Sequence, residues 1–262
     1  MTSNQMILEK AGAIARIILN NPARLNAISM AMWEALDGIL DDLAADAAVR
    51  VVIVSGAGGK AFSAGADISE FERRHADAAA VRHNNERDAA VSAKLESLDK
   101  PVIAQIEGFC LGGAVAFALH CDLRIASDDA RFGIPPARIG HCYSPFEIDR
   151  VMRAVGLSHS REILYTARQF SAREAYEMGL VDRVVATAEL SEYVRNYAAT
   201  IAANAPLTVK AVKRISHEMT KEPRGRDIAM CEALVARCYA SADYDEGRRA
   251  FMEKRRPAFL GR

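Results

Sequence analysis

The sequence predicts an α/β fold in which strands alternate with helices along most of the chain and helices alone complete it. β-Branched runs at residues 13–19, 51–54 and 102–106 are typical of buried strands. Residues 30–43 carry apolar side chains at helical spacing, and a helix of small residues precedes a further apolar run at 123–126. Alternation of this kind implies parallel strands joined by crossover helices.

Beyond about residue 185 the strand pattern stops and only helical patterns remain. Their apolar stripes must be buried on the core or on another subunit. We therefore divide the chain into a core, residues 1–190, and a C-terminal helical region, residues 191–262. The helices are expected at 189–204, 206–219, 227–240 and 243–255.

The charge balance argues against one class of function. Lys plus Arg and Asp plus Glu both number 34, so the chain lacks the positive charge with which proteins grip nucleic-acid phosphates. No apolar run approaches the roughly 20 residues of a membrane span, and the first residues show no secretory leader. We therefore expect a cytoplasmic protein with no nucleic-acid or membrane partner.

Cysteine, histidine and glycine patterns argue against metals and nucleotide cofactors. The cysteines are odd in number, 5, without a C-x-x-C pair, and the 6 histidines lack ligand-like spacing. Neither the dinucleotide fingerprint G-x-G-x-x-G nor a phosphate loop ending in Gly-Lys-Ser/Thr occurs. We expect no metal site, no disulfide scaffold and no separate cofactor.

Two glycine-bearing turns are the first candidates for a functional site. Residues 62–68 (FSAGADI) follow a predicted strand, and residues 108–114 (GFCLGGA) join a strand to a helix. Exposed N–H groups at such turns can hold a carbonyl oxygen that gains negative charge. Each turn also has a structural explanation: Asp67 would be a helix N-cap, and the small residues would allow tight helix packing.

Longer strings identify a family resemblance. AFSAGADI, KPVIAQIEGFCLGGA, CDLRIASDDARFGIP and RAVG occur in that order, with AYEMGLV and EGRRAFMEKRRPAF further on. Together they resemble the enoyl-CoA hydratase/isomerase (crotonase) superfamily along essentially the whole chain. The resemblance implies a spiral of ββα units with C-terminal helices that build a homotrimer or a dimer of trimers. It also implies an acyl-CoA thioester substrate, with coenzyme A as part of the substrate.

The resemblance also implies roles for individual residues. The two backbone N–H groups around the thioester carbonyl would be those of Ala66 and Gly113. Phe251 and Lys254 match tail positions that meet the nucleotide in a neighbouring subunit. For Lys254 and its neighbours, a solvated basic patch at a helix C-terminus is an equally good explanation. The expected coenzyme A contacts within the chain are Arg24, Asn26, Ala27, Ala64, Asp67 and Ile68.

The carboxylates of hydratases in this superfamily are missing. Hydration of a conjugated thioester needs a base to activate water and an acid to protonate the α-carbon. Two glutamates supply them in these hydratases, and the matching positions are Ala116 and Pro136. Neither residue can transfer a proton, so we expect a reaction other than ordinary hydration.

Three residues that follow Gly140 are possible substitutes. Glu147 lies three residues after Ser144, with Pro145 between them, which is the pattern of a helix capping box and favours a structural role. His141 has a side chain that titrates near neutral pH, although single histidines are more often structural. Tyr143 gives a local resemblance to methylmalonyl-CoA decarboxylase, in which a tyrosine at this position would orient the departing carboxylate. An amphipathic wall residue with its hydroxyl in water is the alternative explanation for Tyr143.

These observations leave three hypotheses. The chain is an acyl-CoA lyase or isomerase that forms an enolate without the glutamates, with decarboxylation as its most specific version. Alternatively, it is an enoyl-CoA hydratase that uses Glu147, His141 or a residue of the charged stretch 70–88. Thirdly, it is a non-catalytic acyl-CoA-binding protein. Some superfamily members bind RNA, which the zero net charge disfavours here.

Overall fold

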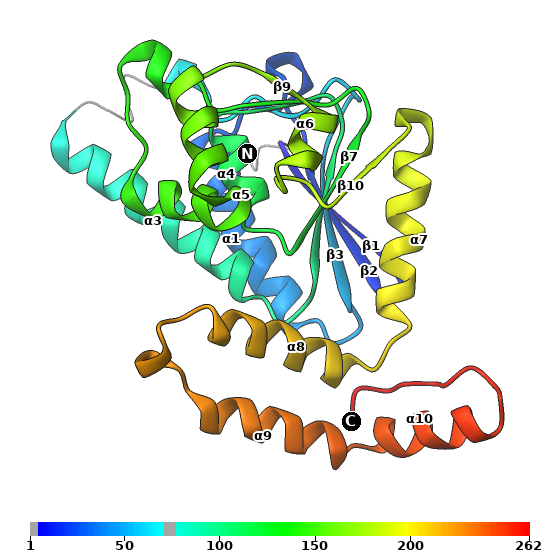
Figure 1. The fold of residues 1–262 in the computed structure, drawn as a ribbon. Coiled ribbons are helices and arrows are strands. Elements are labelled where there is room, and N and C mark those ends of the chain that lie inside the picture. The colour runs from blue at the N-terminus through cyan, green and yellow to red at the C-terminus, as the bar shows by residue number, and fades with distance from the viewer. Residues whose placement is uncertain (1–4, 71–76) are drawn as a thin grey trace.

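The computed structural model describes residues 5–70 and 77–262 and shows two sheets surrounded by helices (Figure 1). The six-stranded sheet has the order β1-β2-β3-β5-β7-β10, and the four-stranded sheet has the order β4-β6-β8-β9. Strands of the first sheet are β1 (Met6–Ala11), β2 (Ile14–Leu19), β3 (Val51–Gly56), β5 (Val102–Ile106), β7 (Leu123–Ser127) and β10 (Arg183–Val185). Strands of the second are β4 (Ala61–Ser63), β6 (Phe109–Leu111), β8 (Arg131–Gly133) and β9 (Phe170–Ser171).

Consecutive strands divide between the two sheets in a regular way. The pairs β3 and β4, β5 and β6, and β7 and β8 each place their first strand in the large sheet and their second in the small one. A helix follows each pair: α3 (Ala78–Ser97), α4 (Gly113–Ala118) and α5 (Pro145–Thr166). This repeat is the spiral of ββα units that the sequence predicted. Solved structures compared below have the same fold.

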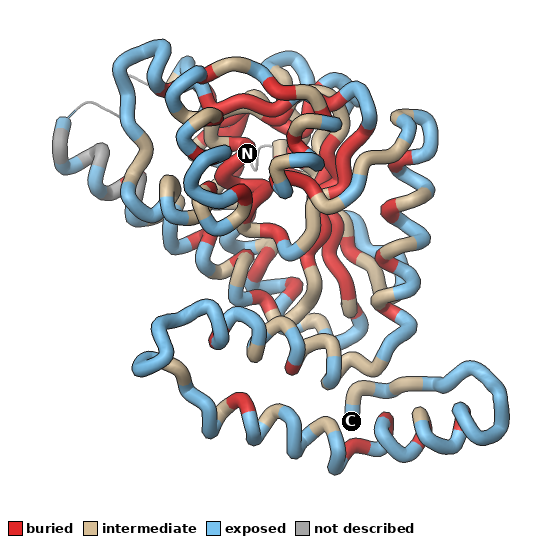
Figure 2. The backbone as a smooth tube through the Cα atoms, in the orientation of Figure 1, coloured by how far each residue is buried: buried red, intermediate tan, exposed pale blue. Residues whose placement is uncertain are grey.

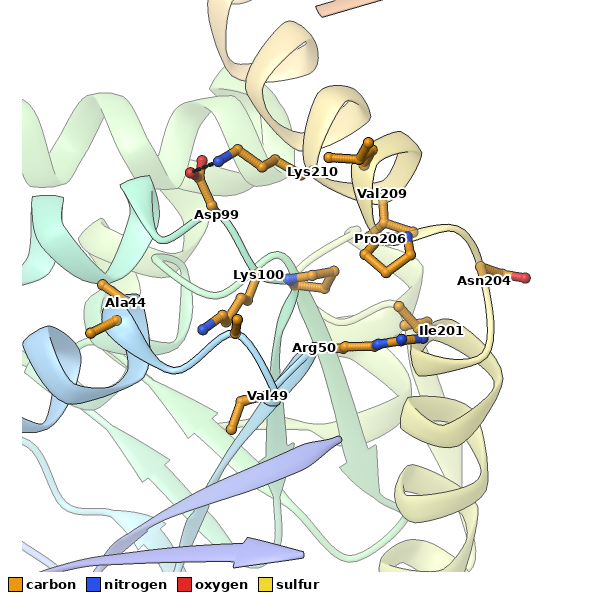
Figure 3. Close-up of a pocket in the computed structure, with 14 residues that line it drawn as sticks. Ala44, Val49, Arg50, Asp99, Lys100, Ile201, Asn204, Pro206, Val209 and Lys210 are labelled. Carbon is orange, nitrogen blue, oxygen red and sulfur yellow. Dashed lines mark ion pairs between the residues drawn. The ribbon is translucent and has the colours of Figure 1, made fainter. Parts of the chain in front are cut away.

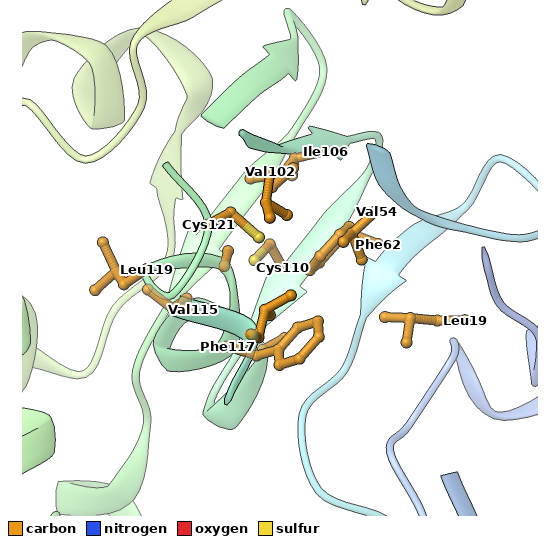
Figure 4. Close-up of a cluster of buried hydrophobic side chains, with 14 of the residues drawn as sticks. Leu19, Val54, Phe62, Val102, Ile106, Cys110, Val115, Phe117, Leu119 and Cys121 are labelled. Atoms are coloured by element: carbon orange, nitrogen blue, oxygen red, sulfur yellow. The ribbon is translucent and has the colours of Figure 1, made fainter. Parts of the chain in front are cut away.

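The main core lies on the face of the large sheet toward α1 (Met30–Ala45) and α3 and fills the space beside the small sheet (Figure 2). It includes Phe62, Phe117 and Phe132, each at most 2% exposed. Cys110 and Cys121 lie within the same cluster, with their sulfur atoms side by side (Figure 4). Burial raises the pKa of Cys121 to about 12, so this thiol stays protonated at neutral pH.

The opposite face of the large sheet is covered by α7 (Leu190–Ala202). Leu190, Val194 and Ala198 point from α7 into a second hydrophobic cluster with Val51 and Ile53 of β3. The apolar stripe of this helix is thus buried on the large sheet, one of the two places that its periodicity allowed. The division of the chain at residue 190 stays a prediction.

The C-terminal helices are α8 (Pro206–Met219), α9 (Ile228–Tyr239) and α10 (Ala242–Met252), close to the predicted ranges. Helix α8 lies against the base of the core, whereas α9 and α10 lie on the far side of α8 (Figure 1). The last residues fold back on α10, where Asp243 accepts hydrogen bonds from Leu260 N and Gly261 N at 2.7 and 2.8 Å. Arg50 of the core donates to Phe259 O at 2.7 Å, which ties the tail to the sheet.

The charged stretch 70–88 is partly described. Residues 71–76 lie outside the described residues, Glu70 ends the short turn Ile68–Glu70, and α3 begins at Ala78. Glu70 Oε2 accepts a hydrogen bond from Met30 N at 2.7 Å and so caps the start of α1. In the part of the chain that the structure describes, no helix has the length and hydropathy to cross a membrane.

Candidate active site

Ala66 presents a backbone N–H that its neighbours leave unused. The bridge between residues 28 and 66 is formed by Ile28 N donating to Gly65 O at 2.7 Å and Asp67 N donating to Ile28 O at 3.1 Å. Both bonds involve the peptide groups on either side of Ala66, whose own N–H faces away from the bridge. Ala66 is exposed, and its N–H finds no acceptor among the described residues.

Gly113 presents the second N–H, at the first position of α4. The preceding Gly112 has φ 58°, which a side chain would disfavour, and its N–H donates to Gly133 O at 2.7 Å. Helix geometry leaves the first N–H groups of α4 without partners in the helix. Within residues 5–70 and 77–262, the Gly113 N–H has no acceptor either. Residues 114–118 are all buried, which fixes the helix beneath this amide.

The two amides lie close together because Gly65 has no side chain. Its φ is 93°, and a Cβ at this position would lie 2.7 Å from Leu111 O and 3.0 Å from Gly113 N. A Cβ on Gly113, in turn, would lie 3.8 Å from Ala66 N. The two turns predicted from the sequence therefore meet, and their N–H groups, which lack acceptors among the described residues, lie close together. Such a pair of donors can stabilise a carbonyl oxygen that becomes negatively charged.

The residues at the two glutamate positions are apolar. Ala116 is 8% exposed on α4, three residues beyond the Gly113 amide. Pro136 is buried at the start of the 3₁₀ turn Pro136–Ile139. Neither position offers a proton donor or acceptor, so acid–base chemistry at this site must come from other groups.

Arg24, Asp67 and Ser69 form a polar cluster beside Ala66. Arg24 Nη1 donates to the two Asp67 carboxylate oxygens at 2.9 and 2.8 Å, and Ser69 donates to Oδ1 from its backbone N at 3.0 Å and its hydroxyl at 2.7 Å. Burial tends to raise the pKa of Asp67, but the hydrogen bonds from Ser69 and Arg24 outweigh it and hold the pKa below its ordinary value. Asp67 is thus a fixed anion that orients the half-exposed Arg24 side chain. Ser69 was missed in the sequence, although Asp-x-Ser is a recognisable local hydrogen-bonding pattern.

Asn26 has a structural role in the free protein. The residue is 0% exposed, and its Nδ2 donates to Ala57 O at 2.9 Å and to Ala61 O at 2.7 Å. Its Oδ1 accepts from Asn21 N at 3.0 Å, so its polar atoms hold the loop around β4. The contact of Asn26 with coenzyme A stays a prediction. Ala27 is also buried, at 7% exposed, whereas Ala64 is half-buried and Ile68 is 83% exposed.

Glu147 forms the capping box predicted from its spacing. Ser144 Oγ accepts from Glu147 N at 3.3 Å, and Glu147 Oε2 accepts from Ser144 N at 2.8 Å. One carboxylate oxygen is thus engaged at the start of α5, and the structural role expected for Glu147 is confirmed.

Tyr143 has a buried hydroxyl that finds no hydrogen-bond partner among the described residues. Its ring packs against the main core. Burial raises the pKa of this phenol well above its usual value, and the fields of Glu147 and Cys110 raise it further. Cys110 lies on β6, three residues before Gly113, so Tyr143 approaches the strand that leads to the second amide. A buried donor without a partner is costly in the free protein and gains most from a ligand acceptor. His141 is exposed, with its ring centroid 6.5 Å from that of Tyr143.

Phe251 and Lys254 are far from these groups within one chain. Phe251 is 82% exposed on α10, and the exposed Lys254 follows the end of that helix with φ 55°. Because α10 lies beyond α8, the two residues do not approach Ala66 or Gly113 of the same chain (Figure 1).

A cavity of about 250 Å³ lies at the opposite end of α1 from Ala66 (Figure 3). Its charged groups are already engaged. Lys100 Nζ donates to Leu43 O and, at 2.7 Å, to Asp46 O, while Lys210 pairs with Asp99. Arg50 donates to Ala202 O and Phe259 O. The cavity therefore marks the joint between the core and α8, and we place the candidate active site at the two amides.

The geometry predicts that replacement by alanine costs much more stability at Gly65 than at Gly113. Gly65→Ala puts a Cβ against a carbonyl oxygen at positive φ, so the free energy of unfolding should fall by about 2 kcal/mol or more. Gly113→Ala meets only ordinary contacts at the start of a helix and should change it by less than about 1 kcal/mol. Urea unfolding measures both values. Equal losses for the two variants would contradict the close approach described here.

Comparison with known proteins agrees with this arrangement. The sequence profile of the enoyl-CoA hydratase/isomerase family matches residues 9–262. A short-chain-enoyl-CoA hydratase of Clostridium acetobutylicum is 35% identical over 98% of this chain and 97% of its own length. A crotonyl-CoA hydratase of Syntrophomonas wolfei is 32% identical over the full length of both chains.

Solved structures show the same likeness in three dimensions. An enoyl-CoA hydratase/isomerase family protein from Hyphomonas neptunium has a TM-score of 0.93 and 37% identity, covering 100% of this chain and 99% of its own. An enoyl-CoA hydratase from Bacillus anthracis has a TM-score of 0.89 and 34% identity, covering 99% of this chain and 100% of its own. With the paired amides and the repeating ββα spiral, these matches establish that the chain belongs to the enoyl-CoA hydratase/isomerase family and is an enzyme of the crotonase superfamily.

Proposed function

We propose that this protein converts an acyl-CoA thioester through an enolate that is held by the N–H groups of Ala66 and Gly113, without the paired glutamates of hydratases. One observation carries the proposal: two amides that have no acceptor among the described residues lie together, while Ala116 and Pro136 leave the expected acid and base positions apolar. The substrate carries the coenzyme A, and the proposal requires no separate cofactor.

The amides favour the enolate over the ground-state thioester. A carbonyl oxygen gains negative charge as the enolate forms, so hydrogen bonds to it strengthen in the transition state. The loss of one such donor typically raises the activation free energy by roughly 3 kcal/mol. Because both donors belong to the backbone, they need no protonation change and remain in place at any pH at which the protein is folded.

Decarboxylation is the reaction that fits these groups best. In a malonyl-type thioester, the bond between the α-carbon and the carboxylate breaks, and its electron pair moves toward the thioester carbonyl to give the enolate. Carbon dioxide leaves, and the α-carbon then takes a proton from solvent or a weak acid. The protein must orient the carboxylate and hold the enolate, and neither task needs a glutamate. The protonated hydroxyl of Tyr143 is suited to donate a hydrogen bond to the departing carboxylate.

Hydration by a relocated acid–base pair is the alternative, and the names of the relatives favour it. Glu147 is near enough to influence the pKa of Tyr143, and His141 is exposed beside the same residue. Against it, one Glu147 oxygen already accepts the Ser144 N–H of the capping box. Non-catalytic binding of an acyl-CoA remains a third outcome for the test below.

The coenzyme A portion would lie beside Arg24, whose guanidinium is held by Asp67 yet half exposed. Ala64 and Ile68 line the same turn, and the backbone there is open to a ligand. Phe251 and Lys254 would reach this region from a neighbouring subunit in a homotrimer or a dimer of trimers. The exposure of Phe251 and Lys254 supports such a contact between subunits. An apolar groove of about 580 Å³ between α8, α9 and α10 supports it as well.

A thioester panel tests the reaction. We expect methylmalonyl-CoA to lose carbon dioxide and crotonyl-CoA to remain unchanged, as followed by mass spectrometry.

Tyr143→Phe should lower kcat by about 10- to 100-fold, the effect of losing a hydrogen bond to a charged group. Glu147→Gln keeps the capping box and should retain activity within about twofold. Gly113→Ala, which places a methyl group near Ala66 N, is the blocked-site control and should abolish turnover.

Other results of the thioester panel would support one of the alternative functions. Water addition to crotonyl-CoA that Glu147→Gln or a His141→Gln variant abolishes would establish a relocated acid–base pair. If Tyr143→Phe leaves decarboxylation undiminished, the role of Tyr143 is wrong. If neither thioester changes while coenzyme A still binds, the site either acts on another acyl group or only binds.

Sedimentation equilibrium tests the assembly. We expect a mass of about three or six chains, because Val235 and Tyr239 of α9 and Phe251 and Met252 of α10 are exposed apolar side chains that another subunit would cover. Phe251→Asp should shift the assembly toward single chains and weaken coenzyme A binding. Tyr176→Asp, a substitution at an exposed aromatic residue of α6 (Ala172–Glu177), is the matched control and should do neither. A wild-type monomer that binds coenzyme A fully would contradict the shared site.

A further inference from the structure

Glu96, near the end of α3, is the common partner of side chains from three other helical segments. Arg150 of α5 donates to its Oε1 and Oε2 at 3.1 and 2.9 Å, a two-pronged pair. His120, just beyond α4, places its buried Nδ1 3.5 Å from Glu96 Oε2, outside hydrogen-bond geometry, and burial lowers the pKa of this imidazole, so the contact is that of a neutral side chain. His217 of α8 places Nδ1 3.8 Å from Oε1. One carboxylate thus joins α3 to the segments that carry Gly113 and Tyr143.

The carboxylate is charged under all ordinary conditions. Burial alone would raise the pKa of Glu96, but the contacts with His120 and Arg150 lower it to about 2. The Glu96 side chain is 28% exposed and that of His120 is 16% exposed, so solvent screens this group less than a surface pair. Arg153 and Glu147 of α5 are the other charged groups whose fields reach Glu96 or His120.

Helix α4 is held in the main core by Val115 and Phe117, and the Phe117 ring packs against those of Trp33 and Phe62. The helix is six residues long, and its ends make further contacts. At its start, Gly112 N donates to Gly133 O, and just beyond its end His120 meets Glu96. His120 lies two residues beyond Ala118, the last residue of α4, so its contact with Glu96 is at the end of the helix opposite Gly113.

We infer that Glu96 is a positioning residue for the oxyanion site, which fixes α4 against α5 and thereby sets the Gly113 N–H relative to the Tyr143 hydroxyl. The residue touches no substrate and acts through His120 and Arg150. The inference rests on the proposed function, because it concerns the strength with which the two amides polarise a thioester. A displacement of about 1 Å at such a site is enough to cost a large part of its effect.

Enolisation of bound acetoacetyl-CoA measures this strength directly. The enolate of this thioester has its own ultraviolet absorbance band, so the enolised fraction can be read without turnover. We expect Glu96→Gln, which keeps the shape and removes the charge, to lower the enolisation constant about tenfold. Binding of coenzyme A, which lacks the carbonyl, should stay within about twofold. His120→Gln leaves the pair between Glu96 and Arg150 intact and should act in the same direction with a smaller loss of Tm.

The matched control is Asp99→Asn. Asp99 lies three residues after Glu96 and also pairs with α8, through Lys210 and Arg214, but it has no ion pair with α4 or α5. This variant should lose some Tm and keep the wild-type enolisation constant. If Glu96→Gln and His120→Gln lower Tm while enolisation stays at the wild-type value, Glu96 is merely structural and the inference is overturned. If the wild-type protein binds acetoacetyl-CoA without enolising it, the proposed function itself fails and the inference falls with it.

Discussion

The contact between two turns at Gly65 is the constraint on which the site depends. A side chain there would collide with Leu111 O and press on Gly113 N, so only glycine allows the Ala66 and Gly113 amides to face one region. The parallel bridge at Ile28 uses the peptide groups on both sides of Ala66 and leaves its N–H free. The rest of the spiral serves to hold these two turns together: each lies at a strand of the small sheet, and that sheet is packed on the main core.

The chemistry available at this point is shaped by what surrounds the amides. The residues at the two glutamate positions, Ala116 and Pro136, are apolar, and the carboxylate of Asp67 is paired with Arg24. Such a site can stabilise charge on an oxygen without providing a strong base. On the proposed function, a reaction in which the substrate supplies its own electron pair suits the site better than the activation of water. The Tyr143 hydroxyl, which has no partner among the described residues, would add directionality and no base strength.

Local patterns in the sequence were reliable where one short segment determines the structure. The helix at 206–219 begins with a proline and was predicted to the residue, and the Ser144 to Glu147 capping box formed as its spacing indicated. Contacts between distant segments could not be predicted in this way. The side chain of Asn26 donates to two backbone carbonyls in a loop more than 30 residues away, and no local pattern indicated this. Glu96 carried no motif, because its partners come from three separate helical segments.

The central claim is that the Ala66 and Gly113 amides alone polarise a thioester carbonyl. Isotope-edited infrared spectroscopy of a bound acyl-CoA with a ¹³C-labelled thioester carbonyl measures this polarisation as a shift of one vibrational band. The account predicts a clear shift to lower frequency in the wild-type protein, which disappears in Gly113→Ala although that variant stays folded. A band at the frequency seen in water for the bound wild-type complex would show that the carbonyl does not lie between these amides and would contradict the account.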